Sequence, residues 1–239
     1  MHPDPVEDSN SAKDKIIVPL DVPSVLRAQQ LVELLGGEVG WFKIGLQLFC
    51  AAGPTIVQEV KQTGSKVFLD LKFYDIPNTV RSAVAAACAL GVEMLTIHLV
   101  GGSEMCVAAI TGRAHSATLL LGVTVLTSQV DETLREVGFR TTVVNQVLLL
   151  AELAKNCGIP GLIASPHELK PLRQRFSSLF TMVIPGVRPS WTEAGDQRRV
   201  MTPAEAIKAG ADYLVVGRPI TAAPNPREAL GRILEEISV

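Results

Sequence analysis

Eight short runs of hydrophobic residues recur along the chain, and segments with helical periodicity separate them. The runs are nearly uninterrupted and rich in Val, Ile and Leu, which is typical of parallel strands buried on both faces. They lie at 15–21, 40–45, 66–72, 94–100, 118–126, 161–165, 181–187 and 213–217. This order of strand-then-helix units in 239 residues predicts a closed (β/α)₈ TIM barrel rather than an open doubly wound sheet.

The segments between the runs carry helix signals. From Thr79 to Gly91, small and branched apolar residues fall on one stripe, and Gly91 is a typical C-terminal stop. Residues 202–205 and 165–168 each have the form of a capping box with proline at the first helical position. No repeat, linker or shift in composition indicates a second domain. We therefore predict a flexible leader over Met1–Lys13 and one catalytic barrel over 14–239.

Composition narrows the class of protein. Hydrophobic residues make up 47% of the chain and charged residues 19%, as in soluble globular domains. The net charge of -2 gives no reason to expect a nucleic-acid or membrane partner. No apolar stretch reaches the roughly 18 residues of a membrane span, and the first residues do not resemble a signal peptide. The four cysteines form no CxxC pair. We expect buried, reduced thiols, a cytoplasmic location and no cysteine-bound metal.

Polar side chains gather where the predicted strands end. In a barrel these carboxyl ends form one rim, and active sites lie there. The polar residues at or just beyond the strand ends are Asp21, Lys43, Asp70, Lys72, His98, Thr127, Arg188 and Arg218. Any one of them could be a solvated loop residue. So many at one rim favour a functional site.

Asp70 and Lys72 are two residues apart on one predicted strand, so both side chains should point to the same face. An isolated pair of this kind would best be interpreted as a surface ion pair. Here the buried run 67–69 leads into the pair, and Lys43 on the preceding strand can reach the same region. Buried charges are costly unless they are paired, and such an array is costly to keep for stability alone. The pattern therefore favours a catalytic role.

The last two predicted strands lead into segments suited to phosphate. Gly217 and Arg218 follow the eighth strand, where barrels commonly bind phosphate. Gly217 permits close approach of the backbone, and Arg218 can bind phosphate oxygens with two hydrogen bonds. The long charged loop after the seventh strand contains Arg188 and Gln197. This loop is either a solvated surface segment or a lid that closes on the ligand.

Residues 70–79, DLKFYDIPNT, resemble the active-site block D-x-K-x-x-D-I-x-x-T of orotidine 5′-phosphate decarboxylases. A single D-x-K would be a weak match. Further segments match the family in its own order from about residue 15 to 235, namely 20–21, 42–45, 123–128, 185–189, 195–199 and 216–219. The chain is therefore identified as a member of this family, of bacterial type.

The resemblance implies the last step of de novo pyrimidine nucleotide synthesis, the decarboxylation of orotidine 5′-monophosphate to uridine 5′-monophosphate, without metal or cofactor. It implies that Lys72 donates a proton to carbon 6 of the pyrimidine as carbon dioxide leaves. Asp70 would lie beside the substrate carboxylate, and Lys43 and Asp75 would complete the charge network.

The resemblance also implies the substrate contacts. Asp21 and Lys43 would bind ribose hydroxyls. The phosphate would meet the residues of the last two loops, Arg188, Gln197, Gly217 and Arg218. Thr127 and Ser128 would meet the pyrimidine or its neighbouring loop, and the sequence leaves open which contact is closer.

The resemblance further implies a homodimer. In this arrangement Asp75, Ile76 and Thr79 would be contributed across the interface, from the partner subunit. Asp70 and Lys72 would serve their own barrel.

The chain departs from the family's pattern at Tyr74, at Leu99 and Val100, and at Trp191. Bacterial relatives commonly have histidine, small residues and glycine at these places. None belongs to the charge array, so the departures affect the loop packing and the rim. His98 is either a core histidine bonded to backbone or a residue that supports the site.

Two other interpretations remain open. One is a related barrel enzyme such as a keto-gulonate-phosphate decarboxylase, which uses a magnesium ion bound partly by a glutamate on the second strand. Lys43 on that strand opposes a metal. The other is a barrel that binds nucleotides without catalysis, against which the intact Lys43, Asp70, Lys72 and Asp75 argue.

Overall fold

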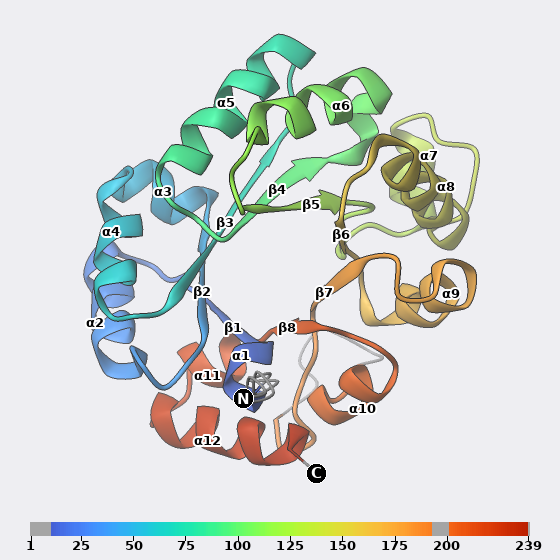
Figure 1. The fold of residues 1–239 in the computed structure, drawn as a ribbon. Coiled ribbons are helices and arrows are strands. Elements are labelled where there is room, and N and C mark those ends of the chain that lie inside the picture. The colour runs from blue at the N-terminus through green and yellow to red at the C-terminus, as the bar shows by residue number, and fades with distance from the viewer. Residues whose placement is uncertain (1–10, 193–200, 239) are drawn as a thin grey trace, which may run out of the picture.

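The computed structural model describes residues 11–192 and 201–238. Within these residues, eight parallel strands close into a barrel in the order in which they occur along the chain (Figure 1). This arrangement confirms the predicted (β/α)₈ fold. The strands are β1 Ile16–Pro19, β2 Trp41–Gly45, β3 Lys66–Phe73, β4 Met94–His98, β5 Leu119–Val123, β6 Gly161–Ile163, β7 Thr181–Pro185 and β8 Tyr213–Val215.

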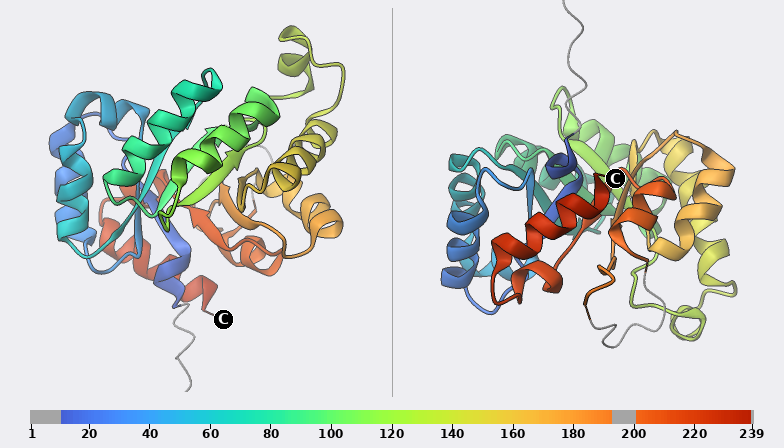
Figure 2. Two further views of the ribbon diagram at one scale, coloured as in Figure 1. Left: turned by 45° about the horizontal axis from the view of Figure 1, so that its top comes forward. Right: turned by 90° about the horizontal axis from the view of Figure 1, so that it is seen from below.

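Helices cover the outside of the barrel (Figures 1 and 2). Those of the first half are α1 Ala12–Lys15, α2 Val25–Leu35, α3 Leu46–Ala52, α4 Thr55–Gln62, α5 Pro77–Ala89 and α6 Gly102–Arg113, with a 3-10 turn η1 at Leu99–Gly101. Those of the second half are α7 Asp131–Glu136, α8 Val143–Cys157, α9 Pro166–Phe176, α10 Pro203–Lys208, α11 Arg218–Thr221 and α12 Pro226–Ile237. None of these described helices is both long and apolar enough to cross a membrane.

Several sequence expectations need correction at their edges. The apolar run predicted as strand 94–100 leaves the barrel after His98, where Leu99 starts the turn η1. Of the predicted leader, residues 1–10 lie outside the described residues, whereas Ala12 and Lys13 belong to α1. α1 lies across the amino-terminal end of the barrel, where the Trp41 indole N–H donates to the Asp14 carbonyl at 2.9 Å.

The four cysteines are free thiols but are not all buried. Cys106 is buried, and this burial, followed by the influence of Cys157, raises its pKa to about 12. Cys50 is exposed. The expectation of uniformly buried thiols was therefore wrong, because α3 turns the Cys50 side chain towards solvent.

The predicted helix signals appear in α5 and α10. Val80, Val84 and Ala87 are buried on one stripe of α5, and Gly91 follows the helix with a φ of 75°. At α10 the Thr202 hydroxyl accepts from the Glu205 N–H at 3.2 Å, and the Glu205 carboxylate accepts from the Thr202 N–H at 2.8 Å. Both segments therefore begin or end as their capping residues indicate.

Alternate residues along each strand face two different cores. The interior cluster of the barrel is formed by Ile17, Trp41, Phe68, Met94, Leu121, Val183 and Val215. Residues of the opposite parity, such as Phe42 and Leu95, pack against the surrounding helices in a larger cluster. The closed sheet is therefore buried on both faces, which explains why its strands appear as nearly continuous apolar runs.

The inward-facing residues change from apolar to polar towards the carboxyl ends of the strands. On β2 the inward position after Trp41 is Lys43, and on β3 the inward position after Phe68 is Asp70. On β4 the inward position after Met94 is Thr96. The same alternation that fills the lower barrel with hydrophobic side chains thus places polar groups at its upper end.

Candidate active site

A cavity of about 490 Å³ opens at the carboxyl ends of the strands, within the size range of small-molecule sites. Apolar residues from β1, β3, β5, β6 and β8 form much of its wall, among them Pro19, Phe68, Val123, Ile163 and Val215. The charged residues that line it are Asp21, Lys43, Asp70, Lys72, Arg188 and Arg218. The structure therefore brings these six predicted site residues to one cavity.

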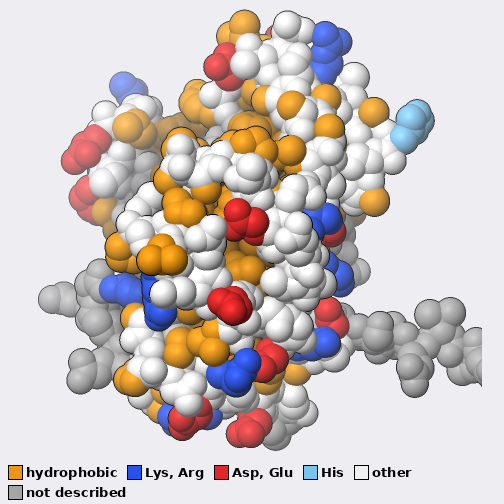
Figure 3. Space-filling view, turned by 90° about the vertical axis from the view of Figure 1, so that its left-hand side faces the viewer, with side chains coloured by type: hydrophobic (Ala, Val, Ile, Leu, Met, Phe, Trp, Pro, Cys, Tyr) orange, Lys and Arg blue, Asp and Glu red, His pale blue; other side chains and the backbone are white. Residues whose placement is uncertain are grey.

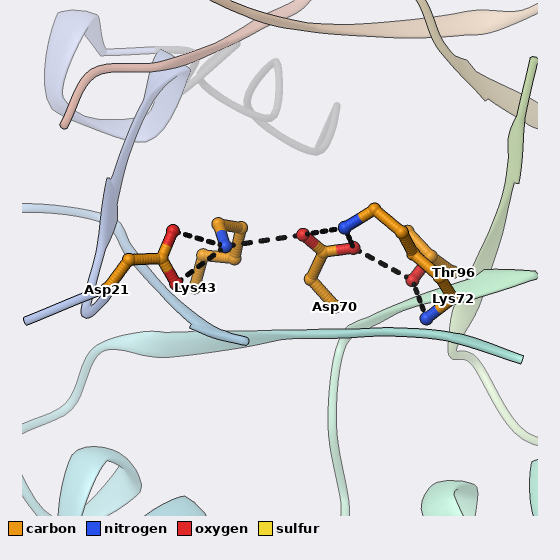
Figure 4. A network of polar contacts seen from close by, with 5 residues as sticks. All are labelled: Asp21, Lys43, Asp70, Lys72 and Thr96. Carbon is orange, nitrogen blue, oxygen red and sulfur yellow. Dashed lines mark hydrogen bonds and ion pairs between the residues drawn. The ribbon is translucent and has the colours of Figure 1, made fainter. Parts of the chain in front are cut away.

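Four charged side chains of alternating sign lie in a row across this cavity (Figure 4). The Lys43 ammonium is 2.9 Å from an oxygen of Asp21 and 3.2 Å from an oxygen of Asp70. On the other side of Asp70, the Lys72 ammonium donates to both carboxylate oxygens at 2.9 Å. The order is thus Asp21–Lys43–Asp70–Lys72, which we call the charge row.

Lys43 and Asp70 are buried, and each exposes only 8% of its surface. Burial raises the pKa of the Asp70 carboxyl, but the Lys43 and Lys72 ammoniums and the hydrogen bonds from Lys72 and Thr96 outweigh this effect. The pKa of Asp70 therefore lies below its usual value, and its carboxylate is ionised at neutral pH. Pairing on both sides lets this buried charge persist.

Lys72 reaches Asp70 through an irregular backbone. The register between β3 and β4 shifts between Leu69 and Phe73, and Lys72 has a φ of 50°. A positive φ costs a residue other than glycine roughly 1–2 kcal/mol. Bulges and strained residues of this kind cluster at functional sites. The sequence analysis predicted the contact between Asp70 and Lys72 from regular strand alternation. The structure instead forms this contact through an irregular stretch of backbone.

Thr96 on β4 supports this irregular segment. Its hydroxyl donates to Asp70 Oδ1 at 3.0 Å and accepts from the backbone N–H of Lys72 at 2.9 Å. The Thr96 side chain is completely buried. The sequence analysis missed this residue, although a polar residue inside an apolar run was a usable signal.

The opposite side of the cavity carries two guanidinium groups. Arg218 is the first residue of α11, directly after Gly217, and Arg188 follows the turn at Gly186, which has a φ of 83°. A Cβ atom at Gly217 would lie 3.2 Å from Pro19 Cγ, so a larger residue would crowd β1. Both arginines and Gly217 line the cavity. Gln197, predicted to act with them, lies outside the described residues.

The other predicted site residues take different positions. Thr127 lines the cavity, whereas Ser128 is exposed and is not part of the described lining. Asp75, Ile76 and Thr79 are exposed around the start of α5. The Asp75 carboxylate accepts the N–H of Ile76 at 2.6 Å. Within one chain, Asp21 and not Asp75 therefore accompanies Lys43, Asp70 and Lys72.

His98 lies at the end of β4 beside the charge row. Its Nδ1 is buried, and no hydrogen-bond partner for it is found in the described part of the chain. Burial, together with the positive charge of Lys72, lowers the pKa of this imidazole, against the opposing effect of Asp70. The Tyr74 ring lies 6.0 Å from the His98 ring. A histidine whose buried Nδ1 has no partner in the described residues differs from the backbone-bonded core histidine considered from sequence.

The described residues contain no group of three or more His, Cys, Asp or Glu side chains placed to bind a metal ion. The carboxylates in the cavity instead contact ammonium groups: Asp21 contacts Lys43, and Asp70 contacts both Lys43 and Lys72. This donor set is suited to an anionic ligand that meets fixed positive charges at two places.

Comparison with known proteins gives consistent results. Residues 14–233 match the model of the orotidine 5′-phosphate decarboxylase / HUMPS family. An orotidine 5′-phosphate decarboxylase of Moorella thermoacetica is 50% identical over 236 residues, which covers 95% of this chain and 94% of the relative. An orotidine 5′-phosphate decarboxylase of Syntrophotalea carbinolica is 49% identical over 234 residues, which covers 95% of this chain and 96% of the relative. The crystal structure of orotidine 5′-phosphate decarboxylase from Lactobacillus acidophilus superposes with a TM-score of 0.83 at 38% identity, covering 94% and 99%.

Proposed function

We infer that this chain, which belongs to the orotidine 5′-phosphate decarboxylase / HUMPS family, is an orotidine 5′-phosphate decarboxylase, a carboxy-lyase of pyrimidine nucleotide synthesis. The observation that carries the proposal is the charge row, with Lys72 at its end inside the cavity. The substrate, orotidine 5′-monophosphate, has an anionic carboxylate on its base and a phosphate on its ribose. The cavity offers positive charge on both sides, at Lys72 and at the two arginines.

In the proposed reaction the bond between carbon 6 and the carboxylate breaks, and its electron pair stays on carbon 6 as carbon dioxide leaves. A new bond then forms from carbon 6 to a proton of the Lys72 ammonium, and solvent returns a proton to the amine. A fixed positive charge stabilises the electron pair as it develops, and a placed acid completes the product. The Lys72 ammonium donates two hydrogen bonds to the Asp70 carboxylate, which hold it in place.

Asp70 has a second proposed task, because it would lie beside the substrate carboxylate. Its low pKa keeps it charged there. Two like charges in a closed site raise the energy of the bound substrate relative to a transition state in which the carboxylate is becoming neutral carbon dioxide. Lys43 offsets the charge of Asp70 from the other side at 3.2 Å and connects it to Asp21.

We propose that the reaction needs no metal or cofactor, because the ammonium of Lys72 supplies the positive charge that a metal would otherwise supply. The related magnesium-dependent barrels need a carboxylate on the second strand, where this chain has Lys43. The test is the loss of ultraviolet absorbance of orotidine 5′-monophosphate with chelator-treated protein. Undiminished turnover supports the proposal, and activity that returns only with magnesium contradicts it.

The proposed contacts to the rest of the substrate follow from the cavity. Asp21 and Lys43 are placed for the ribose hydroxyls, and Gly217 lies beside Arg188 and Arg218 at the side proposed for phosphate. Gln197 remains part of this proposal. Thr127, which lines the cavity, is the better candidate than Ser128 for the pyrimidine side.

We also propose a homodimer in which Asp75, Ile76 and Thr79 complete the partner's site. Ile76 and Tyr74 are 68% and 63% exposed, and Leu46 at the start of α3 is 54% exposed. Figure 3 shows exposed hydrophobic side chains across the side of the barrel that carries α3 and α4. Exposed hydrophobic side chains gathered on one side of a molecule are a typical feature of an interface. A cytoplasmic location, suggested by the free thiols, belongs to the same proposal.

Subunit complementation tests the shared site. Lys72→Ala and Asp75→Ala homodimers should each be nearly inactive. Mixed under conditions of subunit exchange, they should regain part of the wild-type activity, because a hybrid dimer has one site with both residues intact. Exchange without recovery would contradict the action of Asp75 across the interface.

A further inference from the structure

One face of α12 contacts the chain both before and after residues 193–200. Before residues 193–200, the indole of Trp191 lies under the Arg232 guanidinium, whose carbon is 4.0 Å from the ring centre. After them, Glu236 Oε1 accepts the N–H of Ala204 at 3.4 Å. Arg232 and Glu236 are four residues apart on one helix, so they share a face.

α12 is anchored in the fold by its buried residues and its N-terminal cap. Leu230, Ile233 and Ile237 are buried on its inner stripe, and the Asn225 side chain caps its first turn. The helix packs beside α10 and α11, as the view from below shows (Figure 2). Arg232 itself is exposed. Its side chain therefore contributes little to the core of the helix, and its contact with Trp191 needs another explanation.

Trp191 is connected to the cavity by a short, hydrogen-bonded path. The N–H and hydroxyl of Thr192 both donate to the Pro189 carbonyl, at 3.0 and 2.8 Å, and close a turn around Trp191. Directly before this turn, the N–H of Arg188 donates to the Met201 carbonyl at 3.1 Å. The turn that contains Trp191 thus follows Arg188 directly along the chain, and Arg188 lines the cavity.

We propose that Arg232 is a positioning residue, which stacks on Trp191 and thereby keeps Arg188 in place for the substrate phosphate. The proposal rests on the proposed decarboxylase function. It gives a role to Trp191, which takes no direct part in the proposed reaction. Because Arg232 lies outside the cavity lining and only Arg188 transmits its effect, the consequences should be confined to substrates that carry a phosphate.

The test compares kcat and KM for orotidine 5′-monophosphate and for orotidine, the same nucleoside without phosphate. Arg232→Ala and Trp191→Ala should each lower kcat/KM for the nucleotide by about 3- to 10-fold, the range expected for a partly exposed cation–π contact. The slow reaction of orotidine should not change. The double variant should be no worse than either single variant, and Trp191→Phe should retain most of the wild-type value.

Arg175→Ala is the matched control, because Arg175 stacks on Phe176 of α9 at 5.6 Å, away from the cavity. This variant should leave both substrates unaffected. If Arg232→Ala behaves like Arg175→Ala, or slows both substrates equally, the proposal is wrong.

A spectroscopic measurement separates this inference from the proposed function. The chain has two tryptophans, and Trp41 lies at the opposite end of the barrel beside Asp14. The difference between wild type and Trp191→Phe gives the fluorescence of Trp191, and Arg232→Ala should change it. Such a change in a protein that leaves orotidine 5′-monophosphate untouched would refute the decarboxylase function alone. Full activity with no change in fluorescence would refute the role of Arg232 alone.

Discussion

Thr96→Val removes one hydroxyl and keeps the shape of the side chain. The completely buried hydroxyl donates to the ionised Asp70 and accepts from the Lys72 N–H. A hydrogen bond to a charged group contributes about 1.5–3 kcal/mol, and a buried N–H left without a partner costs about 1–3 kcal/mol. Lys72 is only partly buried, so water can reach part of this region. We therefore expect a loss of about 3 kcal/mol in the free energy of unfolding, measured by urea denaturation.

Activity should fall as well, because Thr96 fixes Asp70 relative to Lys72. Thr96 is outside the cavity lining, so the loss should appear in kcat, by about 10- to 100-fold, with KM nearly unchanged. Thr96→Ser keeps the hydroxyl and should retain most of the activity. Thr118→Val is the remote control, since the buried Thr118 hydroxyl donates to the Val92 carbonyl at 2.8 Å. It should lower stability by about 1–2 kcal/mol and leave kcat unchanged.

Two results would refute this reasoning about Thr96. Stability of Thr96→Val within about 0.5 kcal/mol of wild type would mean that neither hydrogen bond contributes. Equal damage from Thr96→Ser and Thr96→Val would mean that retaining the hydroxyl does not protect the site, so the two hydrogen bonds would not be its main contribution.

Three further outcomes follow from the same site. Lys72→Gly should unfold at a higher urea concentration than Lys72→Ala, because glycine adopts the φ of 50° without strain. At Lys66, in the same strand, the order should be reversed, and Lys66→Ala should be more stable than Lys66→Gly. Pairing lowers the pKa of Asp70 in the folded protein, so the ionised carboxylate stabilises the fold at any pH above the ordinary pKa of 3.8. This stability is lost as the pH falls towards the pKa of the folded state, and Asp70→Asn should lack this loss in acid unfolding. Burial, then Lys72, lowers the pKa of His98, so wild type should lose stability as pH falls below the ordinary value of 6.5, and His98→Gln should flatten this part of the pH–stability curve.

The barrel could be predicted from sequence because the two sides of each strand are apolar for separate reasons. Inward residues such as Phe68 fill the interior, and outward residues such as Leu69 pack on helices. Apolar residues just past the strands, such as Leu99, extended the predicted strands, because burial alone does not distinguish the barrel from the turn after it.

The site could be predicted only in part. The sequence placed Lys43, Asp70 and Lys72 together, but the positive φ at Lys72 has no sequence signal, since lysine does not favour that conformation. Thr96 escaped notice because threonine is common in strands for its branched shape alone. Asp21 joins the row through tertiary geometry, which local pattern does not show.

The central claim is that Lys72, at the end of the charge row, carries out metal-independent decarboxylation. The most direct measurement follows orotidine 5′-monophosphate by absorbance with chelator-treated wild type and Lys72→Ala side by side, with the nucleotide product identified. Wild type should convert the substrate fully to uridine 5′-monophosphate, and Lys72→Ala should be slower by at least about 10⁴-fold, because it lacks both the acid and the fixed charge. An untouched substrate with folded wild type, or a Lys72→Ala rate close to that of wild type, would contradict the claim.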